Sequence, residues 1–488
     1  MASKLPPECL QEIFGFLKNK KKKNFNLFSC LLVNRYWCSN AASVLWRNPT
    51  HYPKSLIKTY IKGLPTESKI ILKDKGIILH ETELDVTTFL NYASFIRILN
   101  LNKFYDKVSY IVCNEVPYQN KYVCYLLYFE LCKHLVKQSS NIDYQYEAMS
   151  LGFSPFSTKI INFITESSHL QSLECNTMNT SEEFSQISKI FSSIGELMIS
   201  FNNDGKNPAL INLINGLENL EILKIRGHAY KSSISGSSDI YKALHEKVSS
   251  LTCLDIKISG NMPLSWLSGI KQLEELKLYC MEFIRPEDTK KILAQVADKL
   301  FVKELLVLDI NVESLVATHL GTILLDVGSS LQEMSLRFGS VSDPENLNSL
   351  EEHIMRCSNL LKFKISATTQ FIQNLPQILK SLNNLKELFI LPSSSLDISE
   401  WMLQLGQSIT PSLRKIVFDC GSEHKIGFDF NIESLSDFLN ACEENSVKNL
   451  LFVIKRRNKE ISETTFDNLL SKFVNSGTLN ENFKVVFR

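Results

Sequence analysis

Cysteine and histidine are the residue types of this sequence best able to bind metal or act as nucleophiles. The 488 residues include twelve cysteines and nine histidines, spread along the chain. No two cysteines form a CxxC pair, and the closest pairs, Cys30 with Cys38 and Cys124 with Cys132, have no histidines spaced to complete a zinc site. We therefore expect buried thiols in a reducing compartment, no metal and no cofactor.

Short catalytic motifs are missing as well. The sequence contains no phosphate-binding GxxxxGK loop, no GxSxG elbow, no HExxH and no GxGxxG after a strand. A cysteine–histidine pair for acyl or ubiquitin transfer would have to be assembled from distant parts of the chain. A hydrolase or transferase of that kind is one alternative, but the sequence predicts no catalytic residue.

Composition and charge exclude several classes of partner. The chain has 53 basic and 52 acidic residues, a formal net charge of +1, and 44% hydrophobic residues. This balance supports a packed core and gives no global field that attracts nucleic acid or a membrane surface. The most apolar stretch, residues 122–129, is far shorter than the roughly 20 residues of a spanning helix. Charged residues interrupt the apolar N-terminus, unlike a secretory signal. We expect a cytoplasmic and/or nuclear protein with no nucleic-acid and no membrane partner.

The first fifty residues predict three short amphipathic helices. Prolines at positions 6 and 7 followed by Glu8 are typical of a helix start, and Asn34 is positioned to cap the third helix. The apolar stripes are Leu10, Ile13, Phe14 and Leu17; Leu27, Phe28, Cys30 and Leu31; and Trp37, Ala41, Val44 and Leu45. So small a domain cannot bury all of these side chains. We expect the surplus to contact a partner or a neighbouring domain.

These fifty residues resemble an F-box, the helical motif that docks onto the Skp-type adaptor of cullin–RING ubiquitin ligases. The informative parts are Leu5-Pro6 followed by Glu8, and the later Val33-Asn34 with Trp37. One departure is a lysine-rich insert at residues 18–24, longer and more basic than the usual connection. The resemblance implies that six residues contact the adaptor: Leu5, Pro6, Leu10, Ile13, Leu31 and Val33. Each could instead pack the three helices together, and the sequence alone does not divide the set.

A second pattern repeats along most of the remaining chain: an apolar residue, two arbitrary residues, an apolar residue, one arbitrary residue and a third apolar residue. Eleven such triplets begin at Leu170, Ile194, Leu220, Leu251, Leu273, Leu305, Leu331, Leu360, Leu385, Leu413 and Val447. Their mean spacing of about 28 residues matches leucine-rich repeats, which recur every 20 to 29 residues. The second and third apolar residues, two apart, would share the inner face of a short strand.

The residues between triplets are numerous enough for a crossover helix that returns the chain to a parallel strand. The predicted fold is therefore an α/β leucine-rich-repeat solenoid, with short parallel strands on the concave side and helices on the convex side, preceded by a three-helix F-box. We expect an F-box-like domain at 1–50, a junction and N-terminal cap at 51–168, the solenoid at 169–455 and a C-terminal cap at 456–488. Within the junction, residues 70–72 and 77–79 suggest short strands or turns, and 122–136 a helix.

Residues beside the third apolar position of each triplet would project from the concave face into solvent. Six of them form a candidate partner-binding site: Lys224, Arg226, Lys257, Lys277, Tyr279 and Arg337. Lysine and arginine pair well with carboxylate and phosphate, so this site could bind an acidic or phosphorylated segment. An ordinary solvated sheet face is the alternative. Further along, Phe389, Leu391 and Val417 would make the same surface apolar. They could form a contact site, or a loop or the C-terminal tail could cover them.

The resemblance implies a substrate-recognition subunit of an SCF-type E3 ubiquitin ligase. The F-box would bind the Skp-type adaptor, and through it the cullin–RING ligase, while the repeats bind an unknown target protein. Such a chain is not an enzyme, because the ligase activity resides in the cullin–RING machinery. The main alternative is a non-degradative scaffold that keeps the adaptor contact but leads to no ubiquitin transfer.

Overall fold

The computed structural model contains two compact units. Unit 1 comprises Met1–Ile199 and Asn207–Asn219, and unit 2 comprises Ser200–Lys206 and Leu220–Arg488. The structure describes residues 5–17, 25–48, 56–75, 90–115, 121–139, 142–147, 170–177, 179, 181–190, 194–201, 207–227, 238–258, 264–280, 293–298, 305–312, 314–338, 340–341, 343–367, 369–392, 396–418, 428–456, 463–480 and 484–487. The two units are described separately below.

Unit 1 begins with the three predicted helices, α1 (Pro7–Leu17), α2 (Phe25–Cys30) and α3 (Arg35–Leu45). Their common core consists of Leu10, Phe14, Leu27, Cys30, Ala41 and Leu45. The side chain of Asn34 accepts a hydrogen bond from the backbone N–H of Trp37 at 2.8 Å, which confirms it as the cap of α3. Residues from each of the three predicted apolar stripes therefore pack together into one small hydrophobic core.

Helices and short strands alternate in the next part of unit 1. The helices are α4 (Leu56–Lys62), α5 (Thr66–Asp74), η3 (Tyr92–Phe95), α7 (Leu101–Glu115) and α8 (Lys121–Gln138). Helix α8 confirms the helix expected at 122–136. Residues 70–72 lie in α5, so the strand or turn interpretation is wrong there; residues 77–79 lie outside the described part. The apolar residues at 70–72 did not reveal the helix, because part of its buried face is polar. Ser68 and Lys69 of α5 are buried, and their side chains donate hydrogen bonds to Glu130 and to the carbonyl of Lys62.

The end of the three-helix domain is hydrogen-bonded to the first strand of unit 1. The carbonyl of Arg47 accepts the backbone N–H groups of Arg97 and Ile98 at 2.9 and 3.1 Å. Successive coils of unit 2 are joined in the same way; for example, the Glu221 carbonyl accepts the N–H groups of residues 252 and 253. The ring of Trp46 also packs on Tyr60 and Tyr92, at centroid distances of 5.3 and 4.2 Å. Hydrogen bonds and ring contacts thus join the helical domain to the first strand of unit 1.

Four strands of unit 1 follow in sheet order: β1 (Ile98–Asn100), β2 (Asp143–Glu147), β3 (Leu170–Asn176) and β4 (Glu196–Phe201). Strand β2 pairs in parallel with both β1 and β3. Helices α10 (Ser181–Ile190) and α11 (Pro208–Gly216) follow β3 and β4. Parallel coils thus already occur at β1 and β2, inside the range 51–168 that we expected to be a junction and cap.

In unit 2, nine successive parallel strands form one sheet. In sheet order they are β5 (Ile222–Gly227), β6 (Cys253–Ile258), β7 (Glu275–Cys280), β8 (Val307–Asn311), β10 (Glu333–Arg337), β12 (Lys362–Ala367), β13 (Glu387–Pro392), β15 (Lys415–Phe418) and β17 (Leu451–Arg456). Strand β18 (Lys484–Phe487) pairs with β17. Two short parallel pairs, β9 (Ser314–Leu315) with β11 (Ser340–Val341) and β14 (Leu396–Asp397) with β16 (Phe428–Asp429), lie beyond the main strands.

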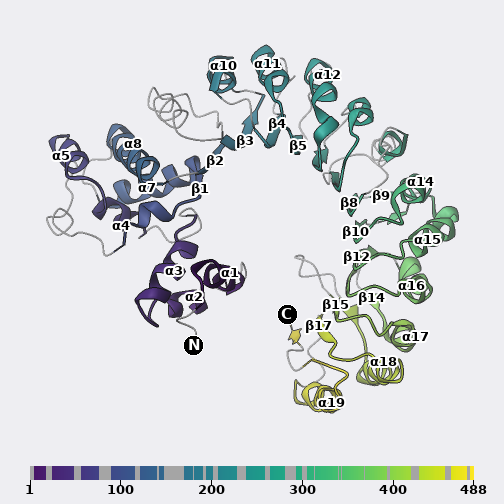
Figure 1. Ribbon diagram of the computed structural model, residues 1–488. Coiled ribbons are helices and arrows are strands. Elements are labelled where there is room, and N and C mark those ends of the chain that lie inside the picture. Colours follow the sequence, from purple (N-terminus) through teal and green to yellow (C-terminus); the bar gives the residue numbers. More distant parts are fainter. Residues whose placement is uncertain are drawn as a thin grey trace. The chain divides into compact units, whose positions relative to one another are not determined.

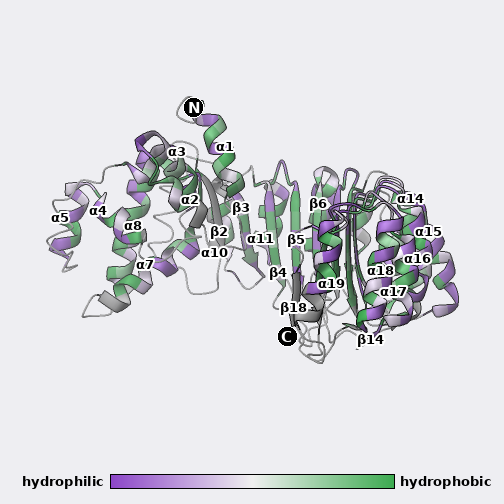
Figure 2. Ribbon diagram, turned by 90° about the horizontal axis from the view of Figure 1, so that it is seen from below, coloured by the Kyte–Doolittle hydropathy of each residue, from purple (hydrophilic) through white to green (hydrophobic). Residues whose placement is uncertain are grey.

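Helices connect these strands, and within unit 2 they lie together on one side of the sheet (Figure 1). They are α12 (Ser238–Lys247), η5 (Val248–Ser250), η6 (Ser265–Gly269), α14 (Ala317–Val327), η7 (Pro344–Asn346), α15 (Leu347–Met355), α16 (Thr369–Ser381), α17 (Ser399–Ser408), α18 (Ile432–Glu444) and α19 (Glu463–Asn475). Figure 2 shows hydrophobic strands β5 and β6, and helices α14–α18 with hydrophilic and hydrophobic stretches. The fold is the expected α/β solenoid.

The strand register confirms the leucine triplets with one exception. The second and third apolar residues of all eleven triplets are buried; in unit 2, Leu223 aligns with Leu254 and Ile225 with Ile256. The last triplet is out of register by two residues, because Ile416 aligns with Phe452 and not with Leu450. The apolar sequence around β17 therefore allowed two readings, and pairing with β15 selects one.

Polar residues just before the triplets tie neighbouring coils together. Asn359 and Asn384 donate side-chain hydrogen bonds to the carbonyls of Ser329 and Ser358, at 2.8 and 3.0 Å. Serine takes the same place elsewhere: the hydroxyls of Ser250, Ser330 and Ser412 donate to the carbonyls of Leu220, Leu305 and Leu385. These bonds satisfy backbone carbonyls that the turn would otherwise leave without a partner.

Candidate partner-binding surfaces

The three-helix domain carries a concentration of exposed apolar side chains. Of the twelve large apolar residues that are exposed in the described part of the chain, six lie between residues 5 and 33. They are Leu5, Ile13, Phe16, Phe28, Leu32 and Val33. Phe16 is 81% exposed and Leu32 is 88% exposed. Exposed apolar residues gathered on one small domain are typical of a protein-binding surface.

The structure divides the six residues that we predicted to contact an adaptor. Leu5, Pro6, Ile13 and Val33 are exposed, and Leu31 is half-buried against the helical core. Leu10 is only 1% exposed and belongs to that core, so it packs beneath the exposed residues and is not itself accessible to a partner. The hydroxyl of Tyr36 on α3 donates to the carbonyl of Leu5 at 2.7 Å, which fixes the position of Leu5 beside the helices.

Sequence reasoning missed three exposed residues, Phe16, Phe28 and Leu32. Phe16 falls outside the stripe that contains Leu10 and Phe14, and a large aromatic residue off a buried stripe was a usable signal. Phe28 was assigned to a stripe, yet it is 46% exposed, whereas Leu27 and Cys30 of the short helix α2 are buried. Leu32 lies in the turn after α2, where no helical periodicity applies.

The second surface is the solvent-facing side of the unit 2 sheet, where side chains align in three rows across the strands. Row 1 consists of Ile222, Cys253, Glu275, Val307, Glu333, Lys362, Glu387, Lys415 and Leu451. Row 2 consists of Lys224, Asp255, Lys277, Asp309, Ser335, Lys364, Phe389, Val417 and Val453. Row 3, toward the carboxyl ends of the strands, consists of Arg226, Lys257, Tyr279, Asn311, Arg337, Ser366 and Leu391.

Ion pairs join many of these side chains to one another. Arg226 binds Asp255 with two hydrogen bonds, of 2.8 and 2.7 Å to the two carboxylate oxygens. In row 1, Lys362 pairs with Glu333 at 2.7 Å and Lys415 with Glu387 at 3.3 Å. Lys277 pairs with Glu275 at 2.5 Å. The cations of this face therefore alternate with acids, and several of them are held in place.

Tyr279, Asp309 and Arg337 form a linked group on strands β7, β8 and β10. The hydroxyl of Tyr279 donates to Asp309 Oδ2 at 2.8 Å, and Arg337 lies over the Tyr279 ring, 5.8 Å from its centroid. Burial and the hydrogen bond to the carboxylate of Asp309 raise the pKa of Tyr279. Arg337 Nη2 is 3.8 Å from Asp309 Oδ1, beyond hydrogen-bond distance. Unlike Arg226, Arg337 keeps most of its donor capacity.

All six residues of the predicted basic site lie on this face, in rows 2 and 3. Lys224 and Lys277 belong to row 2; the other four belong to row 3. Lys257 is exposed, whereas Lys224, Arg226, Lys277, Tyr279 and Arg337 are half-buried. The structure therefore brings the predicted residues together but also places Asp255, Glu275 and Asp309 among them. Their binding of a partner stays a prediction.

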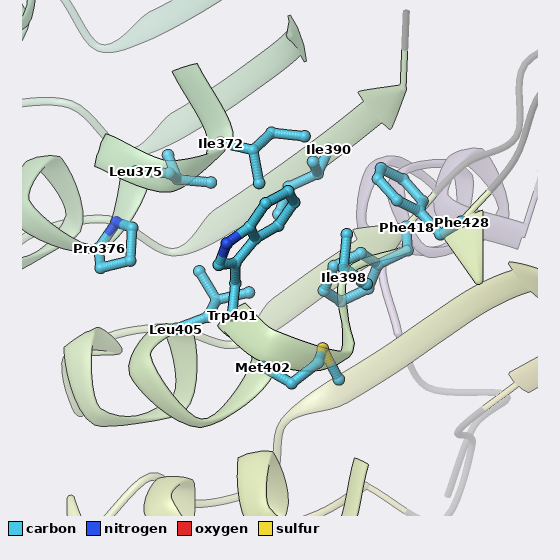
Figure 3. A pocket seen from close by; sticks show the side chains of 10 residues that line it. All are labelled: Ile372, Leu375, Pro376, Ile390, Ile398, Trp401, Met402, Leu405, Phe418 and Phe428. Atoms are coloured by element: carbon cyan, nitrogen blue, oxygen red, sulfur yellow. The ribbon is translucent and has the colours of Figure 1, made fainter. Parts of the chain in front are cut away.

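The C-terminal part of the same face is apolar. Phe389 and Leu391 are half-buried, and Val417 is buried. The ammonium group of Lys415 lies over the Phe389 ring, 4.6 Å from its centroid. On the helix side of these strands, a cavity of about 10 Å³ lies among apolar side chains of α16, α17 and the strands, including Trp401, Phe418 and Phe428 (Figure 3). A cavity of this size has room for about one water molecule and is too small for an organic ligand.

Most of the described cysteines are buried. Burial raises the pKa of the Cys132, Cys357 and Cys442 thiols to about 12, so these cysteines stay protonated at neutral pH. His353 and Cys357 are four residues apart, a spacing that our sequence reasoning overlooked, but Cys357 is buried. Within the described ranges, His, Cys, Asp and Glu side chains make no group of three or more suited to a metal ion.

Comparisons with known proteins agree with the helical domain. A family model described as F-box-like matches residues 2–51. No curated protein matches the sequence. Similar solved structures include the leucine-rich repeat-containing protein LegL7 from Legionella pneumophila, with 17% identity over 61% of this chain and 96% of that chain and a TM-score of 0.35. An internalin from Listeria monocytogenes has 14% identity over 63% and 79%, with a TM-score of 0.31. The yeast Rad7 and Elc1 complex has 12% identity over 80% and 92%, with a TM-score of 0.29.

At such TM-scores the three likenesses imply nothing about the function of this chain. The repeat assignment follows from the parallel register of the strands and the buried triplets. The chain thus has an F-box-like domain at residues 2–51, followed by leucine-rich-repeat coils. Both parts are typical of non-catalytic interaction modules. Among the helices of the described residues, none has the length and apolarity needed to cross a bilayer.

Proposed function

We propose that this protein is a substrate-recognition subunit of an SCF-type E3 ubiquitin ligase. The F-box-like domain binds the Skp-type adaptor and, through it, the cullin–RING ligase, and the leucine-rich repeats hold a target protein. The chain performs no chemistry, since bringing the target close to a conjugating enzyme raises its local concentration there. The cytoplasm and/or the nucleus is where such a subunit would work.

One observation carries this proposal: the F-box-like domain exposes six large apolar side chains while its own core is complete. Contact of water with the exposed apolar surface of residues such as Phe16 and Leu32 is unfavourable in the isolated chain. A docked adaptor would bury that surface. Aromatic and large apolar residues commonly contribute most of the binding energy at such interfaces. The adaptor surface that we propose consists of Leu5, Pro6, Ile13, Phe16, Phe28, Leu32 and Val33.

Co-purification with a Skp-type adaptor tests the contact. We expect the full-length chain to retain the adaptor and the Ile13→Asp, Leu32→Asp double variant to lose it, because both positions are exposed and a buried unpaired carboxylate is costly. Leu325→Asp is a matched control: Leu325 is 57% exposed, on α14 of the repeats. Retention of the adaptor by the double variant would remove the F-box function. Leu10→Asp is unsuitable, because it disrupts the core.

A reconstituted ligase separates a substrate receptor from a non-degradative scaffold. With adaptor, cullin–RING ligase and conjugating enzyme present, a receptor promotes ubiquitination of the protein bound by its repeats, whereas a scaffold binds that protein without transfer. Proteins that accumulate when the ligase is blocked supply candidates for the target. Turnover of a substrate by the isolated chain would instead favour the hydrolase or transferase alternative.

A further inference from the structure

The solvent-facing side of the unit 2 sheet has a charge gradient across its width. Row 1 contains three acids and two cations, and row 2 contains three cations and two acids. The seven residues of row 3 include three cations, Arg226, Lys257 and Arg337, and no acid. The rows thus carry net charges of −1, +1 and +3, on a chain whose total charge is +1.

The cations of row 3 differ in whether they already form ion pairs and hydrogen bonds with neighbouring side chains. Arg226 makes a two-bond ion pair with Asp255, so it chiefly holds strands β5 and β6 together. The side chain of Lys257 is exposed. Arg337 lies over the Tyr279 ring and approaches Asp309 at 3.8 Å, and its Nε, buried in the described structure, has no hydrogen-bond partner. Lys257 and Arg337 are therefore the row 3 cations with charge to offer a ligand.

The positions of these two cations define a spacing. Lys257 on β6 and Arg337 on β10 are three strand steps apart, with Tyr279 and Asn311 between them in row 3. Neighbouring strands are about 4.8 Å apart and an extended chain rises about 3.3 Å per residue, so the two cations match side chains four residues apart in an extended segment. In such a segment, side chains four apart also project from the same face.

We infer that row 3 binds an extended acidic segment of a partner protein, with two carboxylates four residues apart on Lys257 and Arg337. The segment crosses strands β6 to β10 along the carboxyl ends of the strands, and its backbone passes over Tyr279 and Asn311. Tyr279 presents a fixed ring, because its hydroxyl is held by Asp309, and Asn311 offers an amide donor and acceptor. Row 1, with a net charge of −1, disfavours a segment that shifts toward the amino ends of the strands.

This inference deepens the proposed function, since it names the chemistry of the target and takes the strand face as the target-binding surface. Its test uses the full-length chain and a fluorescent nonapeptide with two glutamates four residues apart, at low ionic strength. We expect saturable binding that weakens with added salt. Lys257→Gln with Arg337→Gln should weaken binding about tenfold, the effect of losing roughly 1.4 kcal/mol of charge-assisted bonding.

A matched control removes the same charge from another row. Lys362→Gln with Lys415→Gln also deletes two cations, both in row 1, and should change binding by less than about twofold. If Arg337→Gln alters folding, Lys257→Gln alone still tests the site, because that side chain is exposed.

Four outcomes would overturn the inference: equal losses in the two double variants, no binding of the peptide, equal binding of a peptide with adjacent glutamates, or binding of only a phosphoserine peptide. The adaptor assay uses residues 5–33 and is unaffected by these variants. Failure of the acidic-segment inference can therefore be distinguished from failure of the proposed function.

Discussion

The F-box-like domain and the repeats of unit 2 treat apolar side chains in different ways. Helices α1 and α2 bury one stripe and leave Ile13, Phe16 and Phe28 exposed. On the sheet, each strand buries its two triplet residues, and most of the solvent-facing residues from β5 to β12 are polar or charged. A short helical domain cannot cover its apolar surface, whereas stacked coils cover one another. We therefore expect affinity at the first surface to come from apolar burial, and selectivity at the second from charge.

The largest expected effect separates core from surface within the F-box-like domain. Phe14 is 1% exposed and packs edge-on against Trp37, so Phe14→Ala should destabilise the domain by about 3–5 kcal/mol. Phe16 is 81% exposed, so Phe16→Ala should change stability by less than about 0.5 kcal/mol while weakening adaptor binding. Urea denaturation measures the first effect and adaptor titration the second. Similar destabilisation by the two variants would mean that Phe16 is part of the core.

A smaller effect distinguishes glycines in the two regions. Gly406 of α17 lies against α18, where an added Cβ would meet the carbonyl oxygen of Phe438 at 2.6 Å. Gly406→Ala should therefore force the two helices apart, at a cost of about 1–3 kcal/mol. Gly15 of α1 has nothing within 4 Å of an added Cβ, so Gly15→Ala should be neutral or stabilising by up to about 1 kcal/mol. Thermal unfolding compares them; equal melting temperatures would contradict the close packing of α17 on α18.

The smallest effect concerns buried polar groups. Among the described residues, the F-box-like domain buries the neutral Asn40 and Asn48, whereas the repeats bury the carboxyl group of Glu351. Burial raises the pKa of Glu351 above its ordinary value of 4.5, although a hydrogen bond from Asn374 lowers it in part. The folded state thus holds the proton more tightly, and stability contributed by this group falls as pH rises from about 4.5 through the folded pKa.

Replacing Glu351 tests this pH dependence. Glu351→Gln should raise the melting temperature at pH 7 and reduce its decline between pH 4.5 and 7, because the neutral amide retains the acceptor for Asn374. Glu400→Gln on α17, at an exposed position, is the control and should leave the profile unchanged. An unchanged profile in Glu351→Gln would show that the carboxyl group is not buried in solution.

Regular spacing made much of this architecture predictable from sequence. The triplets predicted the strand positions, since two buried residues per strand suffice to define an inward face. The triplet at Val447 failed because alternating apolar residues fit two registers, and only pairing with β15 decides between them. Strand β2 was missed, because residues 143–147 contain no leucine triplet. Only its parallel pairing with β1 and β3 identifies this segment as a strand of the sheet.

The candidate surfaces were predictable in position and less so in detail. The spacing of Lys224, Arg226 and Lys257 placed them on the exposed face of the sheet, but not the bond between Arg226 and Asp255, which depends on side-chain rotamers. The F-box resemblance indicated the proposed adaptor surface without distinguishing Leu10 from Ile13, because both lie on one helix and only the packing of the three helices buries the first and exposes the second. The local sequence determines on which side of a helix or strand a residue lies, and the neighbouring elements determine whether that residue is exposed.

The hydrogen bonds at the Arg47 carbonyl have a consequence for shortened versions of this protein. Deleting residues 1–48 would leave the N–H groups of Arg97 and Ile98 without their acceptor and uncover the Tyr92 ring. The first strand would then present an open edge, and open edges pair readily with strands of other molecules. Repeats produced without their helical start are thus liable to aggregate, and a shortened protein intended to remain monomeric should begin upstream of α1.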